Sequence, residues 1–399
     1  MTSIKNLIQA KADDYFAEIK SIRQHLHKHP ELSFEENETS AFVAKKLDAY
    51  GISYKKGIAG TGIIGTIEGK KKAEIKNRVV ALRADMDALP IVEENNLSFK
   101  SVNIGKMHAC GHDVHTSSLL GVAKILQEIK DEFSGTILLI FQPGEERIPG
   151  GAKLMLEAGA LDNPKPDLVI GQHVMPSMEV GTVGFKEGMY MASSDEVFLT
   201  IRGKGGHAAM PHDITDTVLI ASHIVVALQQ IVSRIANASV PTVLSFGKII
   251  SDGAVNVIPS EVRIEGTFRT MDEAWRAEAK NRITEIAQSI ARGMGADCDV
   301  EILHGYPFLV NDIGNTKKAK EFAKLYLPAE KVEDMDIRMT AEDFAYYSQK
   351  FPVCFYRLGT GNKSKGINSP LHSSTFDIDE EALKIGAGMM AWLAVSFLI

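Results

Sequence analysis

Side chains that bind metal ions gather in a few short stretches of the 399-residue chain. Histidine nitrogens with a cysteine thiolate suit Zn²⁺, and carboxylate oxygens also admit Mn²⁺ or Co²⁺. A ligand beside a second carboxylate suits metal-assisted hydrolysis, because that carboxylate can act as the general base. The candidates, in chain order, are Asp85, Asp87, His108, Cys110, His112, His115, Glu145, Glu146, His173 and His372.

Spacing limits how these side chains can converge. Cys110 and His112 are two residues apart and cannot share a helix face, so we expect both in a turn before a helix that begins near His115. Glu145 and Glu146 are adjacent, so in extended backbone their side chains point in opposite directions. One of the two can bind a metal while the other faces a water molecule.

Simpler structural interpretations exist for several of these residues. A cysteine taken alone is more often a buried structural thiol than a ligand, but Cys110 has a histidine two residues away on each side. His115 is better explained by structure at a helix start than by metal binding. His25, His27 and His29 alternate at a helix end and are expected to be surface or capping residues.

Predicted strands place most of the candidates at one edge of a sheet. Asp85 and Asp87 follow a strand predicted over 79–83, the two glutamates follow 136–141, and His173 follows 168–171. His372 comes some way after a strand predicted over 353–358. Because sites in open α/β sheets are built at the carboxyl ends of strands, four strand ends are expected to meet.

Strands alternate with helices over most of the chain, which predicts an α/β fold with a mixed sheet flanked by helices. Over 187–306 the order becomes β-α-β-β-α-β, which is typical of a ferredoxin-like domain. We therefore expect a discontinuous catalytic domain formed by 1–186 and 307–399. A smaller domain would be inserted at 187–306.

Composition argues against several classes of partner and compartment. Lys plus Arg is 44 and Asp plus Glu is 51, so the net charge of −7 disfavours nucleic-acid binding. Three cysteines without a CxxC pair fit a reducing compartment, and the N-terminus does not resemble a signal peptide, so a cytoplasmic location is expected. The C-terminal apolar stretch, 385–399, is shorter than the ~20 residues that span a bilayer, so we expect a packed helix and no membrane partner.

Seven segments, spread over nearly the whole chain, resemble the M20 metallopeptidase family. The similarity is greatest to its branch of N-acyl-amino-acid amidohydrolases, which includes hippurate and auxin-conjugate hydrolases. Gly144 and Gln172 stand where that branch commonly has alanine and an apolar residue. The segments are RADMDALPI (83–91), MHACGHDVHT (107–116), FQPGEE (141–146), GQHV (171–174), GKGGHAAMPH (203–212), TAEDFAYY (340–347) and LHSSTFDIDEEAL (371–383).

The resemblance implies roles for the candidate residues. Glu145 would be the general base, and Asp87 would orient a ligand histidine, with Asp85 a weaker candidate for the same task. A structural alternative is that both aspartates cap a strand-to-turn segment. Two divalent cations, Zn, Mn or Co, would be held by Cys110, His112, Glu146, His173 and His372, with Cys110 as the candidate bridge.

The resemblance also implies that the inserted domain acts as a lid and forms a homodimer. Gly203, Gly205 and Gly206 permit a tight turn before His207, and the resemblance implies that His207 reaches the partner's site and stabilises the oxyanion. Asn256 and Arg269, on or beside lid strands, are candidates for substrate binding. An arginine fits a carboxylate bidentately, so Arg269 could bind the substrate's α-carboxylate or pair with an acidic neighbour.

The expected reaction is hydrolysis of the amide bond of an N-acyl amino acid, a small-molecule substrate, to a carboxylic acid and a free amino acid. One alternative is a dipeptidase that uses the same two metals. Another is a metal-binding protein that has lost catalysis, against which the complete set of ligands and Glu145 argue. The glycines at 60, 62 and 65 do not indicate a dinucleotide site, because a strand rather than a helix follows them.

Overall fold

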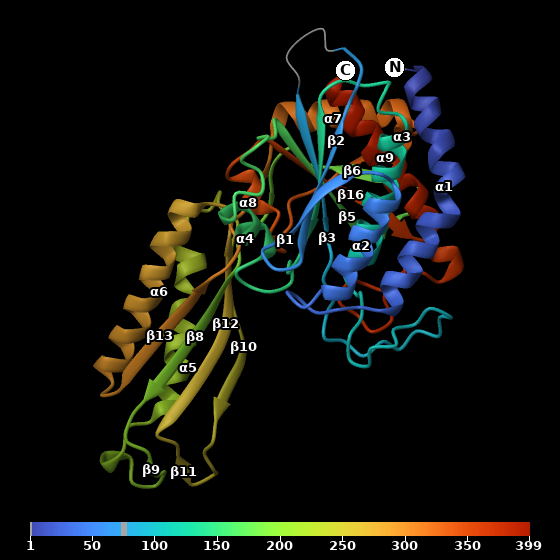
Figure 1. Cartoon of the computed structure of the whole chain (residues 1–399). Helices are drawn as coiled ribbons and strands as arrows, with labels where there is room; N and C mark the ends of the chain where they lie inside the picture. The colour runs from blue at the N-terminus through green and yellow to red at the C-terminus, as the bar shows by residue number, and fades with distance from the viewer. Residues whose placement is uncertain (1, 73–77) are drawn as a thin grey trace. The chain divides into compact units, whose positions relative to one another are not determined.

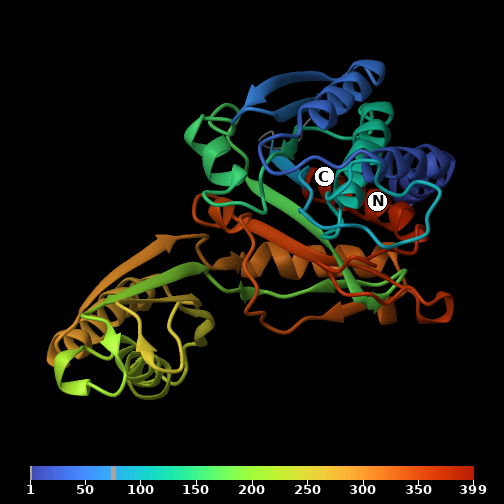
Figure 2. The ribbon, with the colours of Figure 1, turned by 90° about the horizontal axis from the view of Figure 1, so that it is seen from below.

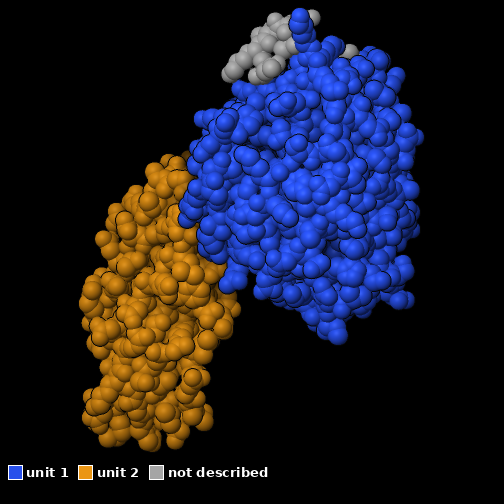
Figure 3. Space-filling model, viewed as in Figure 1, with its two compact units in different colours: residues 1–188, 310–336, 346–399 blue, residues 189–309, 337–345 orange. Residues whose placement is uncertain are grey.

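The computed structural model describes residues 2–72 and 78–399 (Figure 1). The chain divides into two compact units, which Figure 3 colours separately. Unit 1 consists of the chain up to Gly188 together with Val310–Asp336 and Tyr346–Ile399, and unit 2 consists of Met189–Leu309 and Ile337–Ala345. The segment Ile337–Ala345 was expected in the catalytic domain. It belongs to unit 2 because its backbone pairs there, with the carbonyl of Arg338 accepting the N–H of Ala192 at 3.1 Å.

Unit 1 is built on an eight-stranded mixed sheet with the order β1-β2-β4-β3-β5-β16-β6-β15. The four central strands are parallel, and β5 and β16 run side by side through the middle of the sheet (Figure 2). This arrangement confirms the predicted α/β class. The strands are β1 (Ser53–Ile58), β2 (Gly62–Glu68), β3 (Val79–Asp85), β4 (Thr136–Gln142), β5 (Leu168–Glu179), β6 (Val183–Phe185), β15 (Val332–Asp334) and β16 (Val353–Gly361).

The helices of unit 1 pack on the sheet and enclose an apolar core with it. Helix α1 carries a single apolar stripe, whereas α9 is apolar on all sides, and α9 accordingly packs between α1, α3 and the sheet. The helices are α1 (Thr2–Lys28), α2 (Asn37–Ala49), α3 (His112–Glu128), α4 (Gly151–Glu157), α7 (Ile313–Tyr326), α8 (Ala345–Ser348) and α9 (Glu381–Leu398).

Unit 2 has the ferredoxin-like arrangement that its element order predicts. Its four-stranded antiparallel sheet has the order β10-β12-β8-β13, and α5 and α6 pack on it and on each other. Both helices begin at an aspartate N-cap, at Asp216 and Asp272. The elements are β7 (Gly188–Met191), β8 (Asp195–Arg202), β9 (Gly206–His207), α5 (Thr217–Leu228), a π-helix (Ile231–Ile235), β10 (Thr242–Ser251), β11 (Val257–Ile258), β12 (Glu261–Thr270), α6 (Glu273–Gly293), β13 (Asp297–His304) and, at the return to unit 1, β14 (Leu309–Asn311).

Two element boundaries near the candidate site differ from the predictions. Helix α3 begins at His112 rather than near His115, because Gly111 adopts a left-handed conformation with φ 81° and ends the preceding turn there. Strand β5 continues to Glu179, so His173 lies within a strand rather than after one. Pairing with β16 sustains β5 beyond Gly171 although the sequence there becomes polar.

Two stretches are long and apolar enough to cross a membrane, judged by length and composition over the described residues. The first is α9, of which 83% is buried inside unit 1, as expected for a packed terminal helix. The second, Thr217–Ile235, is 28% buried. In the sequence, Ser222, His223 and two glutamines interrupt the apolar run of this second stretch.

Candidate active site

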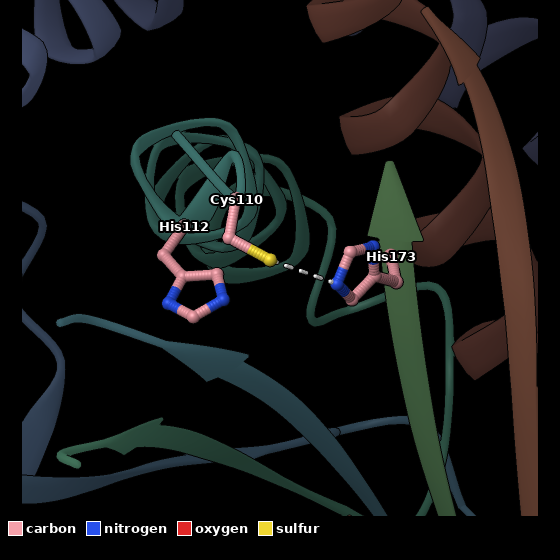
Figure 4. Close-up of side chains that lie close together, drawn as sticks. All are labelled: Cys110, His112 and His173. Carbon is pink, nitrogen blue, oxygen red and sulfur yellow. Dashed lines mark hydrogen bonds between the residues drawn. The ribbon is translucent and has the colours of Figure 1, made fainter. Parts of the chain in front are cut away.

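The predicted ligands converge in unit 1 from separate parts of the chain. Cys110 lies just before α3, His112 is the first residue of α3, and His173 lies on β5 (Figure 4). Cys110 Sγ is 3.6 Å from His173 Nε2. One ligand atom from each of the three residues lies within 4.8 Å of the others, and all three residues are buried. The arrangement is compact enough for a single cation.

A second group of ligands shares Cys110. Its sulfur lies within 4.8 Å of ligand atoms of Glu146 and His372, and His372 Nε2 is 3.3 Å from Glu146 Oε1. His372 follows β16, and its backbone N–H donates to the carbonyl of Ala109 at 2.8 Å, which ties it to the Cys110 segment. Because both groups contain Cys110, its thiolate is placed where it can bridge two cations.

The donor atoms present at the site fit metal ions. Nε2 of His112 and Oε1 of Glu146 are buried and make no well-formed hydrogen bond among the described residues, the approach of His372 to Oε1 being an ion-pair contact only. Burying an unsatisfied polar atom costs about 1–3 kcal/mol, and coordination of a cation removes that cost. Glu145 lies beside them, with Oε2 4.0 Å from His112 Nε2, so a carboxylate is available next to the ligand set.

Hydrogen bonds at Nδ1 orient the rings of the two buried candidate ligands, His112 and His173. His112 Nδ1 lies 2.8 Å from the backbone carbonyl of Asp87 and 3.3 Å from its Oδ1. His173 Nδ1 lies 2.8 Å from the carbonyl of Val174. Since a carbonyl oxygen only accepts, each Nδ1 carries a proton, and Nε2 is the ring nitrogen that can bind a metal once it is deprotonated.

Asp85 and His115 form a hydrogen-bonded chain that leads to the backbone next to His173. Asp85 accepts hydrogen bonds from Arg83 Nη1 at 2.5 Å and from His115 Nδ1 at 2.6 Å. His115 Nε2 in turn accepts the backbone N–H of Val174, next to His173, at 2.9 Å. Both nitrogens of His115 are therefore engaged, so it positions the His173 segment instead of offering a lone pair to a metal.

The charge around the site favours cations. Burial disfavours the charged form of His112, but Asp85 and Asp87 outweigh it and raise its pKa to about 10. Burial and the carboxylates of Glu146 and Glu145 raise the pKa of the Cys110 thiol well above its ordinary value. A cation competes with protons for both groups, so metal binding is coupled to proton release.

The three candidates of the inserted domain lie in unit 2. His207 is exposed on β9, and its β-strand neighbour across the pair is Val257, directly after the exposed Asn256. Arg269 lies on β12 and is partly buried, with Nη1 lacking a hydrogen-bond partner among the described residues. The alternative was that Arg269 pairs with an acidic neighbour, but no carboxylate of the described residues bonds to that nitrogen. Burial lowers the pKa of Arg269.

Sequence reasoning missed a further polar residue beside the ligands. Ser33 Oγ donates to Asp87 Oδ2 at 2.6 Å, and the same oxygen accepts the backbone N–H of Glu146 at 2.9 Å. Ser33 lies in the short connection between α1 and α2, far from the recognised motifs. No ligand-type spacing marks it in the sequence.

Comparison with known proteins decides the family. The family model described as "Peptidase family M20/M25/M40" matches residues 81–395 of this chain. The chain belongs to this peptidase family. The predicted membership in M20 and the predicted hydrolase class are confirmed.

Individual M20 relatives match over most of their length. The N-acetyl-L-cysteine deacetylase of Bacillus subtilis is 42% identical over 91% of this chain and 84% of its own. The N-acyl-L-amino acid amidohydrolase of Geobacillus stearothermophilus is 42% identical over 77% of this chain and 81% of its own. A Bacillus subtilis crystal structure described as a dinuclear metal binding peptidase from the M20 family has 34% identity and a TM-score of 0.80, covering 97% of this chain and 99% of that chain. Amide hydrolysis, the predicted reaction type, is therefore the activity for which close M20 relatives are named.

Proposed function

We propose that this M20 protein hydrolyses the amide bond of N-acyl amino acids at a site that holds two divalent cations. The observation that carries the proposal is the convergence in unit 1 of one thiol, three imidazoles and one carboxylate, with a second carboxylate, Glu145, beside them. The relatives named as amidohydrolases and the neighbour described as dinuclear support it.

The ligand set divides into two groups that share Cys110. His112 and His173 complete one group, and Glu146 and His372 complete the other. Thiolate, imidazole and carboxylate together suit Zn²⁺, Mn²⁺ or Co²⁺. When bound, such cations polarise the substrate carbonyl and lower the pKa of the attacking water.

Glu145 is the proposed general base. It receives the proton of the attacking water and later delivers a proton to the departing amine. Glu145 follows β4, its carboxylate lies within 4.8 Å of ligand atoms of His112 and Glu146, and the residue is only 6% exposed, so it is shielded from bulk solvent. Asp87 is not in direct contact with substrate in this proposal. It fixes the ring of His112 and the backbone of Glu146.

His207 is the proposed donor to the tetrahedral oxyanion, supplied by the partner subunit. The backbone N–H of Ala209 donates to His207 Nδ1 at 3.0 Å, so the neutral ring carries its proton on Nε2. An Nε2–H that projects from an exposed strand is free to donate to a substrate oxygen. The carbonyl of Asn256 accepts the N–H of Ala208 at 2.9 Å, so Asn256 lies beside it as a second substrate-binding candidate.

Arg269 is the proposed partner of the substrate's α-carboxylate. A partly buried guanidinium with an unsatisfied Nη1 gains most from a carboxylate that accepts two parallel hydrogen bonds. This contact would select amino-acid leaving groups with a free α-carboxylate.

We also propose a cytoplasmic homodimer that forms through unit 2. Exposed apolar side chains on and beside α5 support it, with Leu219 48% and Val226 73% exposed. A hollow of about 670 Å³, lined in part by Val218, Leu219 and Val257, adjoins them. Val226→Asp should shift the protein from dimer to monomer in light scattering, and a wild-type monomer would refute the proposal.

A panel of N-acetyl amino acids, assayed with and without a chelator, tests the proposed reaction. We expect release of the free amino acid, loss of release with chelator, and recovery on adding Zn²⁺, Mn²⁺ or Co²⁺. Hydrolysis of dipeptides in preference to N-acyl amino acids would favour the dipeptidase alternative. Metal binding without any hydrolysis would favour the inactive metal-binding protein.

A further inference from the structure

Two buried carboxylates bind the backbone of the turn that carries Glu145, the proposed general base, one before this residue and one after it. After Glu145, Asp87 Oδ2 accepts the backbone N–H of Glu146 at 2.9 Å. Before Glu145, Glu36 Oε1 accepts the backbone N–H of Gly144 at 2.8 Å. The backbone is thus tethered at the residue that precedes Glu145 and at the residue that follows it.

Glu36 is directed to this turn and away from its own helix. It occupies the N-cap position of α2 but makes no capping hydrogen bond there. Its side chain is fully buried, with Oε1 also accepting the N–H of Phe34 at 2.9 Å and Oε2 accepting the hydroxyl of Thr61 at 2.7 Å. A buried carboxylate is costly unless it is hydrogen-bonded, and one of the three bonds that stabilise Glu36 reaches the site.

The chain around Glu36 is shaped to fit the same turn. Phe34 has φ 67°, a left-handed conformation that is strained for a residue of this type and persists where the surrounding structure imposes it. Gly144 has φ 56°, and a Cβ on it would lie 2.4 Å from the Phe34 ring. The absence of a side chain at Gly144 therefore lets the connection between α1 and α2 close onto the turn.

We propose that Glu36 is a positioning residue for Glu145, holding the Gly144 amide so that the Glu145 carboxylate stays directed at the metal-ligand cluster. The proposal rests on the proposed function, in which Glu145 is the general base. It assigns Glu36 a role in turnover, with no contact to substrate and no role as a ligand.

Two substitutions separate the hydrogen bonds of Glu36 from its charge. Glu36→Ala removes the acceptor for Gly144. Glu36→Gln keeps an acceptor oxygen for both backbone N–H groups, and its amide N–H₂ can donate to the Thr61 hydroxyl. Loss of an orienting partner typically costs about 10- to 100-fold in activity. We expect Glu36→Ala to lower kcat by that factor with KM and metal content nearly unchanged, and Glu36→Gln to restore most of kcat.

Glu35→Ala is the matched control, because Glu35 is exposed on the same segment and pairs with Lys106 at 3.5 Å. It should behave as wild type. Glu36→Asp, which keeps the charge but draws the acceptor back by one methylene, covers the case in which Glu36→Ala does not fold. It should show the same fall in kcat with unchanged KM.

Amide hydrogen exchange of the metal-free protein tests the tether without any substrate. The peptide that contains Gly144 should exchange faster in Glu36→Ala or Glu36→Asp than in wild type, Glu36→Gln and Glu35→Ala. If no N-acyl amino acid is hydrolysed but exchange changes in this way, the proposed function fails while the tether stands. Wild-type exchange at Gly144 in the Ala and Asp variants, wild-type kcat in them, or equal losses in the Ala and Gln variants would overturn the inference.

Discussion

Hydrogen bonds to backbone carbonyls, at Asp87 and Val174, commit the Nε2 atoms of His112 and His173 to the site. Residue types and spacing marked ten candidate residues in the sequence, and the resemblance to the M20 family was needed to reduce them to five candidate ligands. The orienting partners were not predictable, because a backbone carbonyl carries no residue signature. Ser33 and Glu36 were not predicted for a related reason. A serine and a glutamate between two helices are typical of an exposed connection, yet both residues are buried.

Replacement of Glu145 by alanine tests its role as general base. We expect metal content to stay at the wild-type value and turnover of N-acetyl amino acids to fall by about 10²- to 10⁴-fold, because proton transfer loses its acceptor. Elemental analysis and an amino-acid release assay measure the two quantities. Normal turnover in the variant would remove this assignment.

Replacement of Arg269 by methionine tests recognition of the α-carboxylate. Hydrogen bonds to charged groups contribute about 1.5–3 kcal/mol, so KM for N-acetyl amino acids should rise roughly 10- to 150-fold. The corresponding α-carboxamides lack the charge and should be hydrolysed equally by variant and wild type. If the variant shows the same KM as wild type for both series, Arg269 does not bind the carboxylate.

At the scale of elements, the junction of α1 with α3 anchors the helix that begins at His112. Arg23 on α1 is 2.9 Å from Asp113 on α3, with both side chains fully buried. His27 lies 2.9 Å from the same carboxylate oxygen. His27 was expected to be a surface or capping residue. It is instead fully buried, because α1 turns this face inward onto α3. The helices themselves follow from apolar periodicity, whereas this charged junction depends on packing that periodicity does not reveal.

Arg23→Met should destabilise unit 1 by about 3–5 kcal/mol, because it leaves a buried carboxylate without its main cation. Burial disfavours ionisation of Asp113, but Arg23 and His27 outweigh it and hold its pKa well below the usual range. A carboxyl with a lowered folded pKa stabilises the protein above its unfolded pKa of about 3.9, and this contribution fades as pH falls through the folded value. The difference between variant and wild type should therefore narrow below about pH 4.

Calorimetric unfolding across this pH range measures the effect. Lys20→Met is the control. Lys20 lies on α1, as Arg23 does, and pairs with Glu380, but its side chain is 42% exposed. Ion pairs between exposed side chains contribute only about 0–1 kcal/mol to stability. Equal unfolding temperatures for the two variants at neutral pH would contradict the assigned role of Arg23.

At the scale of the whole molecule, the proposed chemistry is divided between two units. The proposed base and ligands lie in unit 1, and His207 lies in unit 2. Unit 2 has an apolar core of its own. Its strands and helices therefore carry complete apolar patterns, and their β-α-β-β-α-β order could be recognised in the sequence. The return of Ile337–Ala345 to unit 2 was not predictable, since isolated backbone pairing of a short irregular segment leaves no periodic pattern.

Mixing two inactive variants tests whether one site uses both subunits. Glu145→Ala and His207→Ala should each lose most activity, the latter by about 10²- to 10³-fold as expected for an oxyanion donor. After subunit exchange, a mixed dimer should contain one intact site and recover part of the wild-type turnover. The absence of recovery in demonstrably mixed dimers would place His207 in its own subunit's site.

The most direct test of the central claim is an anomalous diffraction map of crystals loaded with Zn²⁺ or Mn²⁺. The account predicts two cations in unit 1, both coordinated by Cys110 Sγ, with His112 and His173 on one and Glu146 and His372 on the other. A map with no cation at Cys110, or with cations bound only by other residues, would contradict it.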